Sequence, residues 1–402
     1  MLTYKYIARD PANGKKVEGE IQAENEQGVT KYVKEQGYAL IEVNLKKQSG
    51  FSLGKNRITS KDKVIFSRQL STLINAGLPL IQGLRSVLNQ TKSPGLQTVL
   101  NQVITDIESG KSFSVSLAKH PRVFNQVFIS LIAAGETSGT LDTALERIAN
   151  QQEKDAEIIS KVRGAMFYPV IVLLVMTGVV GFMLVSVLPQ VKQLYDGIPG
   201  ARLPFITRAL LAMSNFVISY WWAVLLVVAV IVFLTTRWAR TLGGKRLVDR
   251  LKLRMWPIAA LFSKMYMARF TRTGATLVAS GVPLIQVLEI TADAVNNVHI
   301  EEAIRHATEK VKGGKALSTS LAVEPTFLEL VPQMLKIGED SGAIQQMLEK
   351  TADYYEKEVD NQIKAISTII EPLLMVVLGV VAIIIVSAIL LPIYGLVGQK
   401  IV

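Results

Sequence analysis

Three long stretches without a charged residue constrain the fold of this chain more than any other feature of its sequence. Each contains 28 uncharged residues, and the charged residues that enclose them are Arg163 and Lys192, Arg208 and Arg237, and Glu371 and Lys400. A bilayer core about 30 Å thick requires about 20 apolar residues in a helix. Soluble helices seldom run so long without a charge. The sequence therefore predicts transmembrane helices over 166–188, 217–235 and 371–394; buried helices of a large soluble protein are the alternative.

Basic residues lie mainly on one side of these predicted spans. The formal net charge is +11, and the segment Arg237–Arg254 alone contains seven lysines and arginines. The loop 189–216 contains three basic residues and the tail 395–402 contains one. Because short basic loops stay in the cytoplasm, the N-terminus and the basic linker 236–261 are expected there, with that loop and tail outside. This distribution accounts for the charge without a direct nucleic-acid partner, for which no motif is present.

Two parts of the chain are copies of one unit. Residues 66–84 and 270–288 are identical at ten of 19 positions, including a shared Gly-x-Pro-Leu-Ile-Gln segment. Two further segment pairs match in the same order: GKSFSVSLAKHP with GKALSTSLAVEP, and GETSGTLDTALERIA with GEDSGAIQQMLEKTA. Each copy ends in a predicted span, whereas the middle span has no counterpart and returns the chain to the cytoplasmic side. A duplication of this length is not a solenoid, whose repeats are about 20–50 residues long.

Apolar residues in both copies recur with helical spacing, which predicts antiparallel helical bundles over 60–165 and 262–368. The fold class is therefore an all-α integral membrane protein with two duplicated cytoplasmic bundles and three transmembrane helices. The first 50 residues differ, because alternating β-branched segments flank one short helical segment. They predict a small β-β-α-β module over 1–50, with a hairpin turn at Ala12–Lys15 and a linker over 51–59.

Glycine and proline punctuate the predicted helices at equivalent places in the two copies. Gly77 and Gly281 suit the position after a helix, where a left-handed residue is needed. Pro79 and Pro283 suit the first turn of the next helix, where the missing N–H costs nothing.

The two G-E-x-S-G loops are the most informative polar segments. They place Glu136 and Glu339 beside possible helix ends. Ser138 in the first of these loops, and Ser112 in the segment GKSFSVSLAKHP, are predicted to cap the helices that follow them. One interpretation is a tight turn with an acid near a helix N-terminus, worth about 0.3–1 kcal/mol. The other is a protein contact or a divalent-cation site, for which one carboxylate per loop is too few unless two loops or subunits converge.

No motif for catalysis, cofactor binding or metal binding is evident. SGKS at 109–112 resembles the end of a phosphate-binding loop, but Thr105 stands where that loop needs glycine. His299 and His306 do not form a metal-binding pattern, and the chain has no cysteine. The predicted spans have no ionisable residue in their cores, which disfavours the alternative function of a small-solute transporter or channel subunit.

The duplicated pattern F-x-R-x(8)-G-[L/V]-P-L, G-K-x(4)-S-L-x(3)-P, G-E-x-S-G and a span resembles the type II secretion system F family, which includes platform proteins of type IV pilus assembly. The resemblance covers about residues 1–400, including YxARD at the start. It implies a multi-pass inner-membrane protein without enzymatic activity or cofactor. It also implies coupling of a cytoplasmic hexameric ATPase to the assembly of pilin or pseudopilin subunits.

Other inner-membrane assembly proteins, membrane lipid and further copies of the chain are the remaining expected partners. The structural or interface candidates are Phe66, Arg68, Gly77, Pro79, Gly135, Glu136, Ser138, Gly139, Phe270, Arg272, Gly281, Pro283, Gly338, Glu339, Ser341 and Gly342. One departure is Gly274, which stands where the first copy has Leu70 and indicates either looser or closer packing of its helix.

Overall fold

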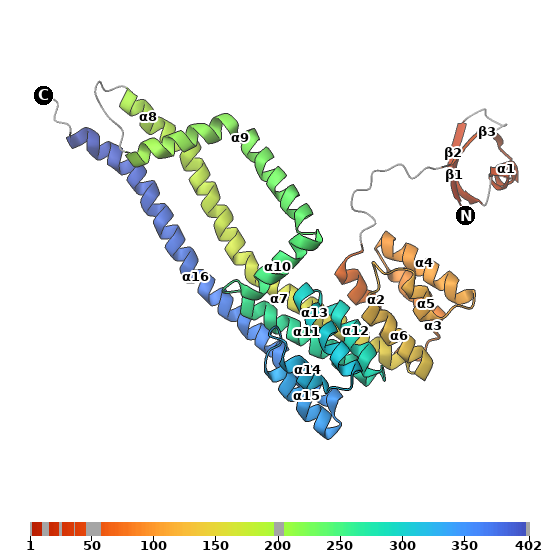
Figure 1. Cartoon of the computed structure of the whole chain (residues 1–402). Coiled ribbons are helices and arrows are strands. Elements are labelled where there is room, and N and C mark those ends of the chain that lie inside the picture. The colour runs from red at the N-terminus through yellow and green to blue at the C-terminus, as the bar shows by residue number, and fades with distance from the viewer. Residues whose placement is uncertain are drawn as a thin grey trace. The chain divides into compact units, whose positions relative to one another are not determined.

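The computed structural model describes residues 2–9, 16–23, 26–35, 37–45, 58–196 and 205–398. The chain divides into an N-terminal unit, 1–57, and a larger unit, 58–402 (Figure 1). The N-terminal unit contains β1 (Leu2–Arg9), β2 (Lys16–Ala23), α1 (Glu26–Glu35) and β3 (Ala39–Leu45). Its sheet is antiparallel in the order β2-β1-β3. The expected hairpin turn at Ala12–Lys15 and most of the linker 51–59 lie outside the described residues.

The first bundle is a series of antiparallel helices around one apolar core. Its elements are α2 (Ser60–Asn75), α3 (Leu80–Gln90), α4 (Pro94–Glu108), α5 (Phe113–Ala118), α6 (Gln126–Ser138) and the start of α7 (Leu141–Phe182). Phe66, Phe124 and Phe128 are buried at its centre, with ring centroids 4.9–6.4 Å apart. Such contacts add about 0.5–1.5 kcal/mol per pair to the area that the rings bury.

The second bundle repeats this order and adds one helix before it. Its repeated elements are α11 (Ala259–Ala279), α12 (Leu284–Val295), α13 (Val298–Lys312), α14 (Leu317–Ala322), α15 (Leu330–Ser341) and the start of α16 (Ile344–Gly398). Phe270 meets Phe327 edge-on at 5.1 Å, and the equivalent pair of the first copy, Phe66 and Phe124, is tilted at 5.7 Å. The duplicated all-α architecture predicted from the sequence is confirmed.

The added helix, α10 (Leu242–Arg254), lies within the segment 236–261 that was expected to be a linker. Its buried Asp249 accepts a hydrogen bond from the backbone N–H of Val298 at 3.2 Å. The Asn297 side chain donates in turn to the backbone carbonyl of Asp249, at 3.4 Å. These contacts hold one face of α10 against the start of α13.

The Gly-x-Pro turns have the backbone geometry that the sequence predicts for the glycine. Gly77 has φ +85° and Gly281 has φ +78°, both left-handed. The Leu78 N–H donates to the Leu73 carbonyl at 3.1 Å, and this six-residue closure satisfies a carbonyl at the end of α2. The prolines lie one residue earlier than predicted, because Pro79 and Pro283 are the N-cap residues of α3 and α12 rather than part of their first turns.

Three helices are long and apolar enough to cross a membrane, as predicted. Two of them are uninterrupted extensions of bundle helices. Helix α7 continues through the π-helical turn η1 (Met183–Val187) into α8 (Leu188–Asp196), and α16 runs for 55 residues, about 83 Å at 1.5 Å per residue. The third is α9 (Phe205–Trp238), which is kinked at Tyr220.

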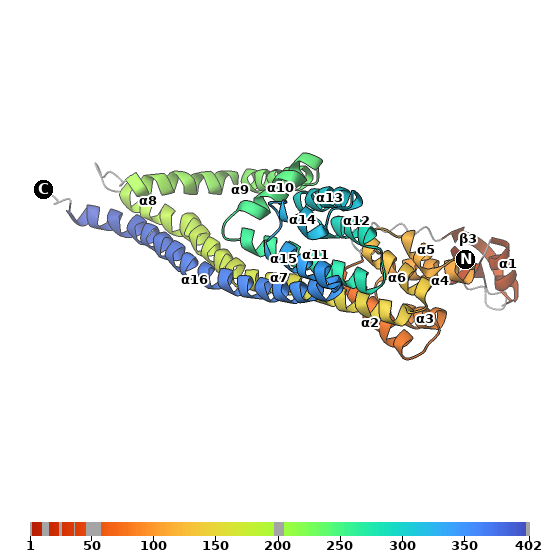
Figure 2. The same cartoon turned by 60° about the horizontal axis from the view of Figure 1, so that its bottom comes forward.

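The helices α7 and α16 run in the same direction from the bundles into the predicted spans (Figures 1 and 2). The predicted external loop 189–216 is largely helical, because α8 and α9 occupy most of it. Residues 197–204 lie outside the described part. Near α8 the three spans meet in one apolar cluster, which contains Leu188, Leu211 and Ala388.

Each bundle has its own apolar cluster, but the cluster of the first bundle extends into the second. Leu277, Val287 and Ile290 from the second bundle belong to the buried cluster of the first. Two hydrogen bonds of 2.8 Å link α7 to α11 nearby, from Arg147 to Ser280 and from Gln151 to Thr273. The first bundle therefore completes its core only with residues from the second.

Candidate functional site

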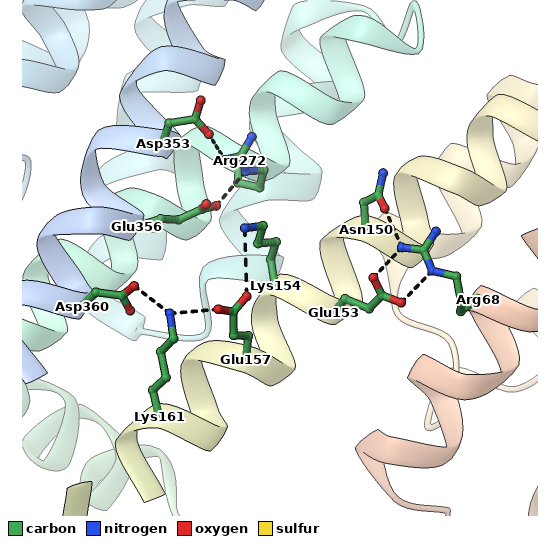
Figure 3. A network of polar contacts seen from close by, with 10 residues as sticks. All are labelled: Arg68, Asn150, Glu153, Lys154, Glu157, Lys161, Arg272, Asp353, Glu356 and Asp360. Carbon is green, nitrogen blue, oxygen red and sulfur yellow. Dashed lines mark hydrogen bonds and ion pairs between the residues drawn. The ribbon is translucent and has the colours of Figure 1, made fainter. Parts of the chain in front are cut away.

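A hydrogen-bonded arginine clamp occurs at equivalent places in the two copies (Figure 3). In the first clamp, Arg68 Nε donates to Glu153 at 2.6 Å, and Nη2 donates to Asn150 at 2.6 Å and to the second Glu153 oxygen. The planar guanidinium thus joins α2 to α7 through a bidentate contact with one carboxylate, a geometry that lysine cannot provide.

The second clamp uses Arg272, which joins α11 to α16. Its Nε donates to Glu356 at 2.7 Å, and its Nη2 donates to Asp353. Glu153 and Glu356 are 203 positions apart, as are Asn150 and Asp353, which is the offset of the G-E-x-S-G loops. Sequence reasoning singled out the arginines but missed their partners, although extending the repeat alignment by a few residues beyond 149 would have paired them.

Charge and burial differ between the two clamps. The Arg68 and Glu153 side chains are 37% and 41% exposed, whereas Arg272 and Glu356 are 20% and 16% exposed. The hydrogen bond from Arg68 lowers the pKa of Glu153, so this carboxylate stays ionised to a lower pH than a free glutamate does. Burial opposes the charge of Arg272, but its bonds to Glu356 and Asp353 outweigh burial and raise its pKa. The second clamp is the more deeply embedded of the two.

A polar cleft of about 480 Å³ lies between the two clamps, where α7 of the first copy faces α11 and α16 of the second. Beyond it, Lys161 of α7 donates to Asp360 of α16 at 2.6 Å and pairs with Glu157 of its own helix at 2.9 Å (Figure 3). Hydrogen bonds to both carboxylates raise the pKa of Lys161, so this link stays charged at neutral pH. The two long helices are thus joined directly by a charged contact.

An apolar layer continues this joint toward the spans. Leu261 of α11 is buried with Val359, Ile363 and Ile366 of α16, and α7 contributes partly buried residues such as Val162. Burial of such side chains contributes about 1.5–3 kcal/mol each. The clamps, the charged link and this layer connect both bundles to the long helices over several turns.

The G-E-x-S-G segments were expected to be loops, but all except their last glycine form the final turns of α6 and α15. Their glutamates bind the starts of other helices in their own bundles. Glu136 accepts from the N–H groups of Phe113 and Ser114 at 2.5 and 3.0 Å, and from the Ser114 hydroxyl at 2.5 Å. Glu339 accepts from the N–H groups of Leu317 and Ser318 at 2.6 and 3.2 Å and from the Ser318 hydroxyl. Each carboxylate therefore satisfies the free amides at the N-terminus of α5 or α14. This geometry agrees with the turn interpretation.

The glycines of these loops have two different tasks. A Cβ on Gly135 would lie 2.6 Å from the Ala144 Cβ, and one on Gly338 would lie 2.9 Å from the Ile344 Cα. Only glycine allows the helices of each hairpin to approach so closely. Gly139 and Gly342 instead have positive φ, of +73° and +68°, and end α6 and α15.

Of the two serines predicted to cap helices, one does so and the other does not. Ser112 caps α5 as predicted, since its hydroxyl accepts from the Val115 N–H. The prediction for Ser138 is wrong: it is the last residue of α6, and its hydroxyl donates back to the Ala134 carbonyl at 2.8 Å. Ser341 in the second copy likewise donates to the Ile337 carbonyl, at 2.6 Å. Both hydroxyls satisfy helix carbonyls and do not cap the next helix.

Gly274, the departure between the copies, reflects closer packing. It is buried in α11, and a Cβ there would lie 3.4 Å from Leu348 Cδ1 of α16. The space beside Gly274 thus has room for a Cβ but is otherwise filled by Leu348, next to the second clamp. Leu70, at the equivalent place in the first copy, fills the space between helices instead.

The residues that resembled catalytic or metal-binding groups are engaged in structure. Lys111 of the SGKS segment forms an ion pair at 2.6 Å with Asp106, a residue just before the end of α4. His306 contacts Glu324, and His299 lies against α10. Among the described residues, no group of three or more His, Asp or Glu side chains could hold a metal ion.

Known protein families and individual proteins match this chain over nearly its whole length. The family model described as "Type II secretion system (T2SS), protein F" matches residues 66–189 and 270–392, and its N-terminal domain model matches 1–44. The type IV pilus assembly protein PilC of Thermus thermophilus is 39% identical over 99% of both chains. TapC, a type IV pilus assembly protein of Aeromonas hydrophila, is 35% identical over 95% of this chain and 93% of its own. Type II secretion system protein F of Vibrio cholerae is 31% identical over 98% of both.

Proposed function

This chain belongs to the type II secretion system F family, and we propose that it is a non-enzymatic inner-membrane platform for pilus or pseudopilus assembly. In this proposal it couples a hexameric ATPase on the cytoplasmic side to the assembly of pilin or pseudopilin subunits in the membrane. Other inner-membrane assembly proteins and further copies of the chain complete the machine. The names of the similar proteins, which concern type IV pilus assembly and type II secretion, support this choice.

One observation carries the mechanical part of the proposal: α7 and α16 each run without a break from a bundle into a span. A helix is stiff along its axis because each turn is hydrogen-bonded to the next. A force applied to a bundle therefore reaches the membrane as a tilt or rotation of that helix. The charged link and the apolar layer make α7 and α16 move together.

The coupling is tested by softening α16 where it leaves the bundle. Ala365, Thr368 and Ile369 are exposed there, so changing all three to glycine removes little packing but costs, relative to alanine, about 1 kcal/mol of helix stability at each site. We expect this variant to accumulate in the membrane normally, yet to yield few surface filaments or little secreted product in cells lacking the unaltered gene. The matched control keeps Ala365 and carries Thr368→Ala and Ile369→Ala, which preserve the helix. Equal assembly by the glycine and alanine variants would refute the coupling.

The proposed orientation places the N-terminus and both bundles in the cytoplasm and the C-terminus outside. Reporter fusions after Gly54 and after Lys315 should show cytoplasmic activity. The reason is that the basic segment Arg237–Arg254 is expected to stay in the cytoplasm, and both fusion sites lie on the same side of the membrane as this segment. A fusion after Asp196 should report an external position. An external signal at Lys315 would contradict the orientation, whatever the outcome of the glycine experiment.

A further inference from the structure

Helix α10 has an outer face that combines large apolar and basic side chains. The residues of this α10 outer face, all exposed and lying along one side of the helix, are Leu242, Arg246, Leu247, Arg250, Leu251 and Arg254. Leu242 is 88% exposed, and Trp256, two residues beyond the helix, is 77% exposed. Asp249 is buried away from this face, and Leu253 packs on the core of the second bundle. Apart from Arg246, which pairs with Glu302 of α13 at 2.6 Å, the outer face is therefore not the side by which the bundle holds α10.

The start of α10 is fixed at the end of a membrane span. Only three residues separate it from Trp238, the last residue of α9. The N–H and hydroxyl of Thr241 both donate to the Trp238 carbonyl, at 2.9 and 2.7 Å. A Cβ on Gly244 would lie 2.0 Å from that same carbonyl oxygen, so the first turn of α10 is packed directly against the end of α9. The N-terminal end of α10 is thereby held at the edge of the bilayer.

The other end of α10 is held at a similar level by the long helices. Ile258, four residues after Arg254, packs against the same apolar layer as Ala165 of α7 and Ile370 of α16. Those two residues directly precede the apolar segments of their helices. Both ends of α10 therefore lie where a span meets water, and the helix between them runs along the membrane face that carries the bundles.

We propose that the α10 outer face lies in the headgroup layer of that membrane face and binds anionic phospholipid headgroups. Burial of leucine and tryptophan side chains at the boundary of the acyl chains is favourable in free energy. Arginines at this depth extend their guanidinium groups to the phosphates. Within the part of the chain that the structure describes, no carboxylate pairs with Arg250 or Arg254. A hollow of about 420 Å³ between α10 and α13 is lined by Arg246, Arg250, His299 and Glu302. Glu302 pairs with Arg246 at 2.6 Å, so Arg250 is the lining cation left for a headgroup there.

The absence of cysteine from the chain allows a clean depth measurement. A single Leu247→Cys, carrying an environment-sensitive fluorophore, would be compared with Val115→Cys in the full chain. Val115 is exposed and lies on α5, whose N-terminus binds Glu136 at the end of the bundle opposite the spans. Each labelled protein is reconstituted in phosphatidylcholine vesicles and in vesicles with about 30% phosphatidylglycerol, both containing a lipid-bound quencher near the headgroup.

We expect strong lipid quenching at position 247 and little at 115, with the larger value in the anionic vesicles. Arg250→Glu with Arg254→Glu should lower the ratio of docked to free α10 by at least about 25-fold, since each basic residue near an anionic surface is worth about fivefold. Arg122→Glu with Lys315→Glu makes the same charge change on exposed bundle sites and should have no such effect. Quenching at 247 no stronger than at 115, or independent of phosphatidylglycerol, would overturn the proposal. Protection of 247 from a water-soluble quencher only after the partner ATPase is added would assign this face to a protein instead.

Discussion

Replacing Glu339 by lysine is expected to open the start of α14 and loosen the second bundle. The carboxylate binds two backbone amides and the Ser318 hydroxyl at a helix N-terminus, and the lysine would leave these donors unpaired and add a cation beside them. Hydrogen bonds to a charged group contribute about 1.5–3 kcal/mol each, but they are coupled here, so the expected loss is about 3 kcal/mol. Amide exchange in the segment 315–322 should then accelerate roughly 100-fold, as measured by mass spectrometry on the full chain.

The neighbouring Asp340 provides the matched control. Its side chain is exposed, and Asp340→Lys makes the same change of charge one residue away. Exchange in the same segment should stay within about twofold of the unaltered protein, because exposed substitutions usually change stability by less than about 0.5 kcal/mol. Similar acceleration in both variants would mean that net charge, and not the contact with α14, stabilises this end of the bundle. If only Glu339→Lys accelerates exchange, the variant is locally unfolded. Its failure to assemble filaments would in that case give no evidence for a docking surface.

Replacing Arg272 by methionine is expected to destabilise the joint between α11 and α16 by about 2–3 kcal/mol. Methionine retains much of the aliphatic stem but leaves the Glu356 carboxylate, only 16% exposed, without its partner. The cost lies between that of a surface pair, about 0–1 kcal/mol, and that of a buried one, about 3–5 kcal/mol. The thermal midpoint of the full chain in detergent, followed by circular dichroism, should fall by several degrees.

The first clamp is the internal control for the second. Arg68→Met removes the equivalent contact, but Arg68 and Glu153 are each more than a third exposed, so the cost should be about 1 kcal/mol or less. Adding Glu356→Gln to Arg272→Met should recover part of the lost stability, because it removes the unpaired charge. Equal effects of the two single arginine changes would contradict the difference in burial that separates the clamps.

The parts of this fold that could be predicted are those that depend on neighbouring residues along the chain. The apolar stretches predicted three spans, and the repeated Gly-x-Pro segment predicted the left-handed Gly77 and Gly281, because both signals are local. What could not be predicted is that α7 and α16 pass from bundle to membrane without a break. The residues at that boundary, such as Val162 and Ile366, look like ordinary bundle residues, and only their packing in one layer shows that the helices continue together.

The candidate site shows the same division. Arg68 and Arg272 stood out because they repeat within a conspicuous motif, whereas their partners lie more than 80 residues away and outside the aligned segments. The role of Ser138 was misjudged because a serine beside a helix break can cap the next helix or bond backward to its own. Which of these it does depends on whether Gly139 or Ser138 leaves the helical conformation, and the left-handed glycine decides it.

The core that the two bundles share has a consequence for how the protein is made. Leu277, Val287 and Ile290 complete the apolar cluster of the first bundle, yet they are synthesised after two intervening spans. A ribosome adds about 5–20 residues per second, so the gap between Ala165 and Ile290 corresponds to roughly 6–25 s. During this interval the newborn first bundle carries an uncovered apolar patch while α9 is being inserted. The order of synthesis thus makes membrane insertion of α9 a step on which the folding of the earlier domain depends.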